Sequence, residues 1–297
     1  MALYTTRQTL SSGKTTLSGD TIANVLITND NYDKHGGAIL INGDAEVTID
    51  GATFSSNTID GTGTKYGAAI GYNSTKALII NNTVFDSNNN IQTGASGNGG
   101  TGGGGAIYLY NRNSTTPCGD VYISGSTFIN NSSRNGGAIY NNGSDLTIID
   151  SYFGSNTATL NGPSIRNGAG TLTLGGVTFC AKGTSDSFEI FNQSTMYIVG
   201  EIVLENEHTR IINEKSSGTN AKIILVGDSF FTGDAAEAGI LRAIDGCKVS
   251  GNIKNEAGEF YATDGYVMVE DDTGDIYLHK GEYNDIDRKS TRLNSSH

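Results

Sequence analysis

The chain contains no tryptophan and only 2 prolines and 3 cysteines in 297 residues. The cysteines, Cys118, Cys180 and Cys247, are far apart and include no CxxC pair, which argues against a zinc site or a redox motif. No apolar run approaches the roughly 18 residues that a membrane-spanning helix needs. The first residues also lack the basic and apolar segments of a signal peptide. We therefore expect any export signal to lie upstream.

Basic residues are scarce as well: 19 Lys and Arg stand against 31 Asp and Glu, for a net charge of −12. This balance argues against nucleic acid and anionic membranes as partners, because both need a basic face. Glycine, in contrast, is abundant at 41 residues, and Gly, Asn, Ser and Thr favour turns over helix interiors. The apolar residues recur in short clusters rich in β-formers, so we predict an all-β chain.

The last eleven residues, 287–297, match a common sequencing adapter read as protein. We expect them to be a non-native tail and give them no weight in the fold. Without their three basic residues and one acidic residue the balance is 16 against 30, or −14.

A repeat decides the predicted fold. One apolar residue is followed five positions later by another in eight pairs: Ile22/Ile27, Ile49/Phe54, Ile80/Phe85, Ile123/Phe128, Ile148/Phe153, Leu174/Phe179, Val199/Leu204 and Leu225/Phe230. The second members follow one another at intervals of 25 to 43 residues, most of them 25 or 26. The longer intervals contain a Gly-rich stretch near residues 90–105 and a second insertion near 111–118.

A further cluster completes each unit and, in chain order, is the first of three; the two members of each pair lie in the second and third clusters. It reads Gly-Gly-Ala-Ile or a close variant, at Gly36–Ile39, Gly67–Ile70, Gly104–Ile107 and Gly136–Ile139, with weaker versions around Ile165 and Ile190. Such units bury a continuous core only by stacking on their neighbours. We predict a right-handed, single-stranded parallel β-helix with three short strands per coil and a basal coil of 25–26 residues.

Stacking predicts columns of equivalent residues. Phe54, Phe85, Phe128, Phe153 and Phe179 should form the spine of the core. Asn follows three residues later in four units, at Asn57, Asn88, Asn131 and Asn156. We interpret these four as turn residues, because Asn tolerates left-handed backbone and its amide can bond neighbouring corners. The Gly-Gly pairs should be corners that need positive φ.

These two motifs, Gly-Gly-Ala-Ile and Phe-x-x-Asn, resemble the polymorphic outer membrane protein repeat and the adhesin-like surface proteins that carry similar coils. The resemblance covers about residues 21–180. Beyond Phe179 the Asn is replaced by Lys182, Glu207 and Gly233, and the Gly-Gly-Ala signature is lost. The resemblance implies an exported passenger or surface stalk used in adhesion, but names no receptor.

We expect four segments: a truncated N-terminal edge at 1–20, the β-helix at 21–232, a less regular continuation at 233–286, and the tail at 287–297. The expected location is extracellular or at the cell surface. We expect the scaffold to be monomeric and its partner to be a protein or glycan on a host or neighbouring cell.

An enzyme is the main alternative, because many β-helix proteins cleave polysaccharides. Such a site needs clustered carboxylates on an outer face. The predicted outward residues are Thr48, Ile79, Tyr122, Thr147, Thr173 and Ile198 in the second strand and Thr53, Val84, Thr127, Tyr152, Thr178 and Val203 in the third. Neither column contains an acid, a base or a His. We therefore expect no catalytic residues, no cofactor and no metal, and interpret Asp271, Asp272 and Asp275 as a solvated charge cluster.

The outward column of the first strand holds the candidate binding residues. It reads Leu40, Gly71, Tyr108, Tyr140, Arg166 and Phe191. Tyr108 and Tyr140 could stack on a sugar or a partner protein, with Arg166 and Phe191 extending the stripe. The structural interpretation, cross-strand aromatic pairing on a solvated sheet, is the more frequent one for such residues.

Overall fold

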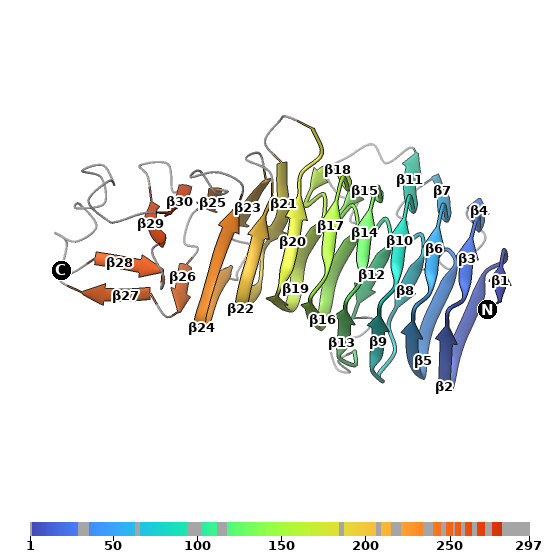
Figure 1. The fold of residues 1–297 in the computed structure, drawn as a ribbon. Helices are drawn as coiled ribbons and strands as arrows, with labels where there is room; N and C mark the ends of the chain where they lie inside the picture. The colour runs from blue at the N-terminus through green and yellow to red at the C-terminus, as the bar shows by residue number, and fades with distance from the viewer. Residues whose placement is uncertain are drawn as a thin grey trace.

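The computed structural model of the chain describes residues 2–28, 36–62, 66–93, 102–111, 118–183, 187–205, 209–214, 221–233, 240–244, 248–251, 253–256, 259–262, 266–270 and 275–280. These residues form strands β1–β30 and turns. The described part of the chain contains no helix, and so no helix that could cross a membrane. The chain is all-β, and most of its strand pairs are parallel. The strands lie side by side in a row, with β1 and β2 at one end and β27 and β28 at the other (Figure 1).

One group of strands carries the first and second clusters of every unit. Each member pairs in parallel with the equivalent strand of the next unit. Its strands are β2 (Gln8–Ser18), β5 (Ile39–Asp50), β8 (Ile70–Tyr72), β9 (Leu78–Asn81), β12 (Ile107–Tyr110), β13 (Val121–Ser124), β16 (Ile139–Ile149), β19 (Ile165–Gly175), β21 (Ser187–Asn192), β22 (Thr195–Leu204), β23 (Thr209–Glu214) and β24 (Lys222–Gly233). In β5, β16 and β19 the two clusters belong to one continuous strand, which the sequence pattern divides in two.

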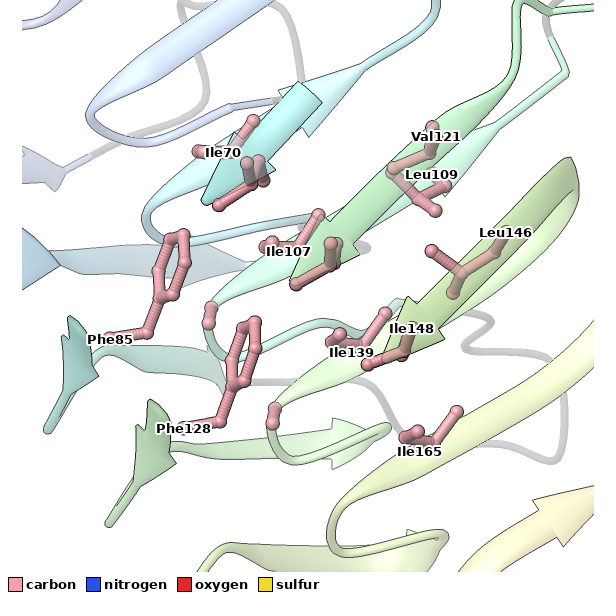
Figure 2. Close-up of a cluster of buried hydrophobic side chains, with 14 of the residues drawn as sticks. Ile70, Phe85, Ile107, Leu109, Val121, Phe128, Ile139, Leu146, Ile148 and Ile165 are labelled. Atoms are coloured by element: carbon pink, nitrogen blue, oxygen red, sulfur yellow. The ribbon is translucent and has the colours of Figure 1, made fainter. Parts of the chain in front are cut away.

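The third cluster position holds the phenylalanines. Its strands are β3 (Thr21–Ala23), β6 (Thr53–Ser55), β10 (Val84–Asp86), β14 (Thr127–Ile129), β17 (Tyr152–Gly154) and β20 (Val177–Cys180), with β1 (Leu3–Tyr4) beside β3. The five phenylalanines pair in register and are fully buried. Their rings stack at centroid distances of 4.7 to 5.2 Å. Figure 2 shows Phe85 and Phe128 beside the isoleucine columns of Ile107, Ile139 and Ile165.

A separate five-stranded sheet, called sheet B below, lies between the third cluster and the next Gly-Gly pair. Its strands are β4 (Leu26–Thr28), β7 (Thr58–Thr62), β11 (Asn89–Thr93), β15 (Ser132–Asn135) and β18 (Thr157–Asn161). All four of its strand pairs are parallel. The sequence pattern, which predicts three segments per unit, does not anticipate this sheet.

The corner asparagines form a buried ladder. Asn57, Asn88, Asn131 and Asn156 are at most 1% exposed. Asn88 Nδ2 donates to Asn131 Oδ1 (2.9 Å) and to the Phe54 carbonyl (3.0 Å). Asn57 and Asn131 make both kinds of bond, and Asn156 donates to the Phe128 carbonyl. The left-handed residue is the one before each Asn, such as Ser87 with φ 57° and Asn130 with φ 56°. The amide of each ladder residue thus bonds a neighbouring turn, while the left-handed backbone lies at the residue before it.

A second ladder follows the first-strand isoleucines. Asn141 Nδ2 donates to Asn167 Oδ1 (3.0 Å), and Asn167 Nδ2 donates to Asn192 Oδ1 (2.7 Å). All three side chains are fully buried. The repeated Ile-x-Asn pattern at Ile139, Ile165 and Ile190 is the signal that could have revealed it.

The Gly-Gly corners serve two purposes. The first glycine has positive φ, as at Gly36 (70°) and Gly136 (58°). The second glycine is needed for close approach: a Cβ on Gly105 would collide with the backbone oxygen of Gly137 in the next repeat. Only glycine accepts either condition without strain.

The predicted pairing is wrong at the two ends of the repeat. Ile22 pairs with Phe54, so Leu17/Ile22 is the first pair, and Ile27 pairs with Ile59 in sheet B. A spacing of five does not fix the phase, because Leu17 also precedes Ile22 by five residues.

At the other end, Ile198 pairs with Leu174 and is fully buried, whereas Val199 is 38% exposed. Ile198 is thus inward, not outward as predicted. Leu204 pairs with Phe179, so the step from Ile198 to Leu204 is one residue longer than the step from Leu174 to Phe179. Phe230 lies in register with Glu201 rather than with Leu204.

Parallel pairing is not confined to residues 21–232. It includes β2, before residue 21, and continues through the pairs β23–β25 (Ile240–Ile244) and β24–β26 (Lys248–Gly251). The strands β27 (Ile253–Glu256), β28 (Glu259–Ala262), β29 (Tyr266–Glu270) and β30 (Asp275–Lys280) then pair antiparallel. The tail at 287–297 and much of both predicted insertions, 94–101 and 112–117, lie outside the described residues.

Candidate functional site

The predicted aromatic column on the first strand is assembled in register. Tyr108 pairs with Tyr140, Tyr140 with Arg166, and Arg166 with Phe191. However, Tyr108 and Tyr140 are each only 3% exposed, and Phe191 is 7% exposed. The interpretation of these rings as an open stacking platform, and the alternative of a solvated pairing, both need correction: the rings are buried.

Neighbouring tyrosines cover the column. The Tyr66 ring stacks on Tyr108 at a centroid distance of 4.2 Å, and the Tyr110 ring stacks on Tyr108 at 5.4 Å. Tyr140 meets Tyr108 edge to face at 5.2 Å. Burial raises the pKa values of Tyr108 and Tyr140 above their ordinary range. The four tyrosines form a hydrophobic cluster of their own, which the column alone could not predict because Tyr66 precedes its Gly corner.

Arg166 is held by the same cluster. Its guanidinium lies 4.9 Å from the Tyr140 ring centroid and 6.0 Å from that of Phe191. One nitrogen donates to Gln193 Oε1 at 3.0 Å. These contacts fix the side chain along the column and favour a structural role, since a cation over aromatic faces stabilises their packing.

The outer face of sheet B forms a groove that the sequence pattern did not indicate. It has a volume of about 580 Å³ and crosses the neighbouring strands β11, β15 and β18. Its lining consists of Asn89, Asn90, Ile91, Ser132, Ser133, Arg134, Thr157, Ala158, Thr159 and Leu160. Among the residues that the structure describes, the lining combines the Arg134 cation with amides, hydroxyls and short apolar surfaces and includes no carboxylate.

Register explains how the groove is built. Asn89 pairs with Ser132, and Ser132 with Thr157, so these three partly exposed residues form one column across the groove. The Ser132 hydroxyl donates to Asn89 Oδ1 at 2.7 Å. Between the outward residues, Asn90 and Ser133 turn inward and bond backbone carbonyls of the adjoining corners, at 3.0 Å to Gly103 and 2.6 Å to Asn135. The floor of the groove is therefore rigid.

The predicted outward columns of the second and third strands are partly exposed, apart from Ile198 and the more exposed Tyr122. The third-strand face has one chemically mixed cluster, where Tyr152 lies beside Cys180 and Glu205. Burial, and then the nearby Cys180 and Glu205, raise the pKa of Tyr152 to about 12. Burial and the Glu205 charge also raise the pKa of the Cys180 thiol. A thiol held protonated is a poor nucleophile.

Glu189 is a titratable residue that sequence reasoning missed. It is fully buried, and its carboxylate accepts hydrogen bonds from the hydroxyls of Ser164 and Ser187. Burial raises the pKa of Glu189 to about 7. Its place just before the first-strand isoleucine, where earlier repeats have alanine, could have drawn attention to it. Because no part of it reaches solvent, we assign it no binding role.

No metal-binding group of three or more His, Cys, Asp or Glu side chains occurs among the residues that the structure describes. Cys118 and Cys180 are free thiols. Cys247, Asp271 and Asp272 lie outside the described residues, as does the side chain of Asp275.

The chain matches no known family model, no curated protein and no solved structure. The resemblance to the polymorphic outer membrane protein repeat therefore rests on the motifs alone.

Proposed function

We propose that the chain is part of an exported, non-catalytic cell-surface scaffold, adhesin-like or passenger-like, built as a right-handed parallel β-helix. The single observation that supports this most is the stacking of equivalent residues over successive repeats. Phe54, Phe85, Phe128, Phe153 and Phe179 lie in one column, with an asparagine ladder beside them. A stack of this kind extends in one direction and offers a long surface relative to its core.

The surface chemistry fits a role outside the cell. The net charge of −12 keeps such a stack soluble, and the described outward columns are rich in Thr and Tyr. Repeated hydroxyl-bearing strands give a scaffold many weak contact points, which suits recognition of a protein or glycan on a host or neighbouring cell.

Cell binding tests this function. The purified chain, labelled with a fluorophore, should bind saturably to some cells of a mixed panel of bacterial and epithelial cells, and unlabelled chain should compete. Binding that is absent from every cell type, or that does not saturate, would refute the proposal.

The alternative is a carbohydrate-active β-helix enzyme. Incubation with a panel of acidic polysaccharides, followed by detection of unsaturated and reducing ends, separates the two. A scaffold leaves the polymers intact. Product formation by the purified chain would show that the enzyme is the right assignment.

A further inference from the structure

One outer face of the stack carries a continuous apolar column. The face belongs to the strands that hold the second cluster and is called the second-strand face below. Its apolar column consists of Ile149, Val199 and Val226, whose side chains are 39%, 38% and 45% exposed. Gly175 lies between the first two, and a Cβ built on it would lie 3.0 Å from Val199 Cγ2 and 3.6 Å from Ile149 Cγ2. The methyl groups of Ile149 and Val199 therefore close over Gly175, and the column continues to Val226, which pairs with Val199.

The column is apolar only in this part of the stack. In the coils before Ile149, the positions in register with it are polar: Ser18, Asp50, Asn81 and Ser124. A surface that serves only solubility gains nothing from the change to apolar residues. Exposed apolar side chains that join into one surface are typical of sites of association.

A second column on the same face is ordered by charge. It lies four residues earlier in each strand, and its members pair in parallel register from coil to coil: Asp145, Thr171, Thr195, Lys222 and Lys248. Asp145 is exposed, and both threonines are partly exposed. Asp120 extends the acidic end, because it directly precedes β13, which pairs in register with β16. The column thus runs from two acids through two threonines to two lysines.

We propose that two copies of the chain associate through their second-strand faces, about a two-fold axis that runs parallel to the strands. Such an axis keeps the position along the strand and reverses the order of the coils, so that each column meets itself. We place the axis between the coils of β19 and β22. Thr171 then faces Thr195 of the second copy.

This arrangement makes the charged column complementary to itself. The register sets Asp145 opposite the position of Lys222 in the second copy, and Asp120 opposite that of Lys248. Each acid–lysine pair occurs twice because of the symmetry. Opposite charges that face each other across an interface fix its orientation and register.

The same axis brings the apolar residues together. Ile149 faces Val226 of the second copy, and Gly175 with the methyl groups over it faces Val199. A two-fold axis along the stack would instead set the charged column of one copy against the apolar column of the other. The agreement of both columns in a single arrangement is the observation that carries the proposal.

The face has the size of a weak, specific dimer interface. It spans β13, β16, β19, β22, β24 and β26, which follow one another at about 4.8 Å (Figure 1). Along each strand it extends over five residues, as from Asp145 to Ile149, at about 3.3 Å each. A face of about 29 by 17 Å buries roughly 1,000 Å² over both copies, which is the lower limit for a biological interface.

A partner of different sequence accounts for the pattern less well. Such a partner would explain an exposed apolar column, but not why each acid of the face meets a lysine when the face is turned onto itself. The inferred dimer departs from the monomer expected from the sequence, because the exposure of Ile149 and Val199 is a property of the folded stack. It is also independent of the proposed scaffold function, since a monomer and a dimer can both bind cells.

Sedimentation velocity of the full chain over a range of concentrations tests the dimer. We expect a reversible monomer–dimer equilibrium with a dissociation constant on the order of 10 μM. Val199→Glu places acids at the centre of the interface and should weaken the dimer about tenfold or more. Leu160→Glu is the matched control, because Leu160 is 55% exposed but lies on sheet B; it should dimerise as the wild type does. Circular dichroism checks that both variants are folded.

A charge exchange tests the orientation. Asp145→Lys alone and Lys222→Asp alone each set like charges against each other twice, so each should weaken the dimer about tenfold or more. The double variant Asp145→Lys/Lys222→Asp restores opposite charges and should regain most of the wild-type affinity. In one copy these two residues are three strands apart, at about 4.8 Å per strand, so the rescue reports contact between copies.

A chain that stays monomeric at concentrations well above the expected dissociation constant would overturn the inference. A dimer that Val199→Glu does not weaken, or that Leu160→Glu weakens equally, would place the contact on another face and overturn it as well. A double variant no better than its single variants would refute the two-fold arrangement. If the wild type is monomeric and still binds cells, only the dimer fails and the scaffold function stands.

Discussion

The asparagine ladder allows the sharpest test of how the stack is held together. We predict that Asn131→Ala strongly destabilises the chain. The Asn131 side chain donates to the Phe85 carbonyl (2.9 Å) and to Asn156 Oδ1 (3.0 Å). It accepts from the backbone N–H and the side-chain Nδ2 of Asn88, at 3.0 and 2.9 Å. Alanine removes all four bonds.

The magnitude follows from burial. Asn131 is fully buried, so water cannot easily replace the lost partners. Four bonds at about 1 kcal/mol each predict a loss of about 4 kcal/mol in the free energy of unfolding. Asn131 itself has no positive φ, so alanine adds no backbone strain.

Urea unfolding followed by circular dichroism measures the loss, and amide hydrogen exchange locates it. The Asn88 amide, which loses its acceptor, should exchange much faster. The adjacent Asn130→Gly removes an exposed side chain that donates to Asp86 Oδ1 at 3.2 Å, and should cost less than about 1 kcal/mol. A loss in Asn131→Ala no greater than in this control, with unchanged protection of the Asn88 amide, would refute the reasoning.

Three further substitutions test other parts of the stack. Phe128→Ala empties the centre of the phenylalanine column, where the neighbouring rings lie 4.7 Å away on each side. It should lower the free energy of unfolding in urea by about 4 kcal/mol, whereas Tyr122→Ser, at a side chain that is 45% exposed, should lower it little. Equal losses in the two variants would contradict a tightly packed column. Gly137→Ala places a Cβ against the backbone oxygens of Pro163 and Thr157. It should lower the unfolding temperature far more than Gly183→Ala, whose Cβ meets no atom within 4 Å, so that only the strain of its positive φ remains; similar shifts would count against close packing. Burial raises the pKa of Glu189 from 4.5 to about 7, so the folded state favours the protonated form. The contribution of Glu189 to the free energy of unfolding is therefore fully present below pH 4.5 and is lost as the pH rises to 7, by about 3 kcal/mol. In Glu189→Gln that slope should disappear from unfolding measured between pH 4.5 and 7, and an unchanged slope would assign it to another group.

The parts of the fold that could be predicted from the sequence are those that repeat the same side chain in the same place. Phe in the third strand and Ile of the Gly-Gly-Ala-Ile corner each pair in register with the same residue type in the next repeat, so the same residue type recurs at that position. The prediction is wrong where equivalent positions no longer hold the same type of residue. Ile22 and Ile27 are both apolar, and only the register of the strands shows that Ile22 continues the phenylalanine column.

Sheet B was missed for a physical reason. Its inward positions read Ile27, Ile59, Asn90, Ser133 and Ala158, so no apolar alternation marks the strands. Asn90 and Ser133 are buried because backbone carbonyls at the corners accept their hydrogen bonds, a condition that depends on neighbours distant in sequence. The candidate site was misplaced for a related reason. The tyrosine column looked exposed because nothing in the pattern placed Tyr66 over Tyr108.

The difference between repeated inward residues and varied outward residues indicates where a partner can bind. Inward columns are constrained by their copies above and below, so that a change at Phe128 or Asn131 disturbs two neighbouring repeats. Outward side chains on sheet B need not repeat from one strand to the next: Asp60 and Ile91 lie in register although they differ in charge and polarity. A stack therefore keeps its architecture while this face changes from repeat to repeat. The groove across β11, β15 and β18 lies on that face, whereas the tyrosine column is buried, so among the described residues the face of sheet B is one that can vary without disturbing the core.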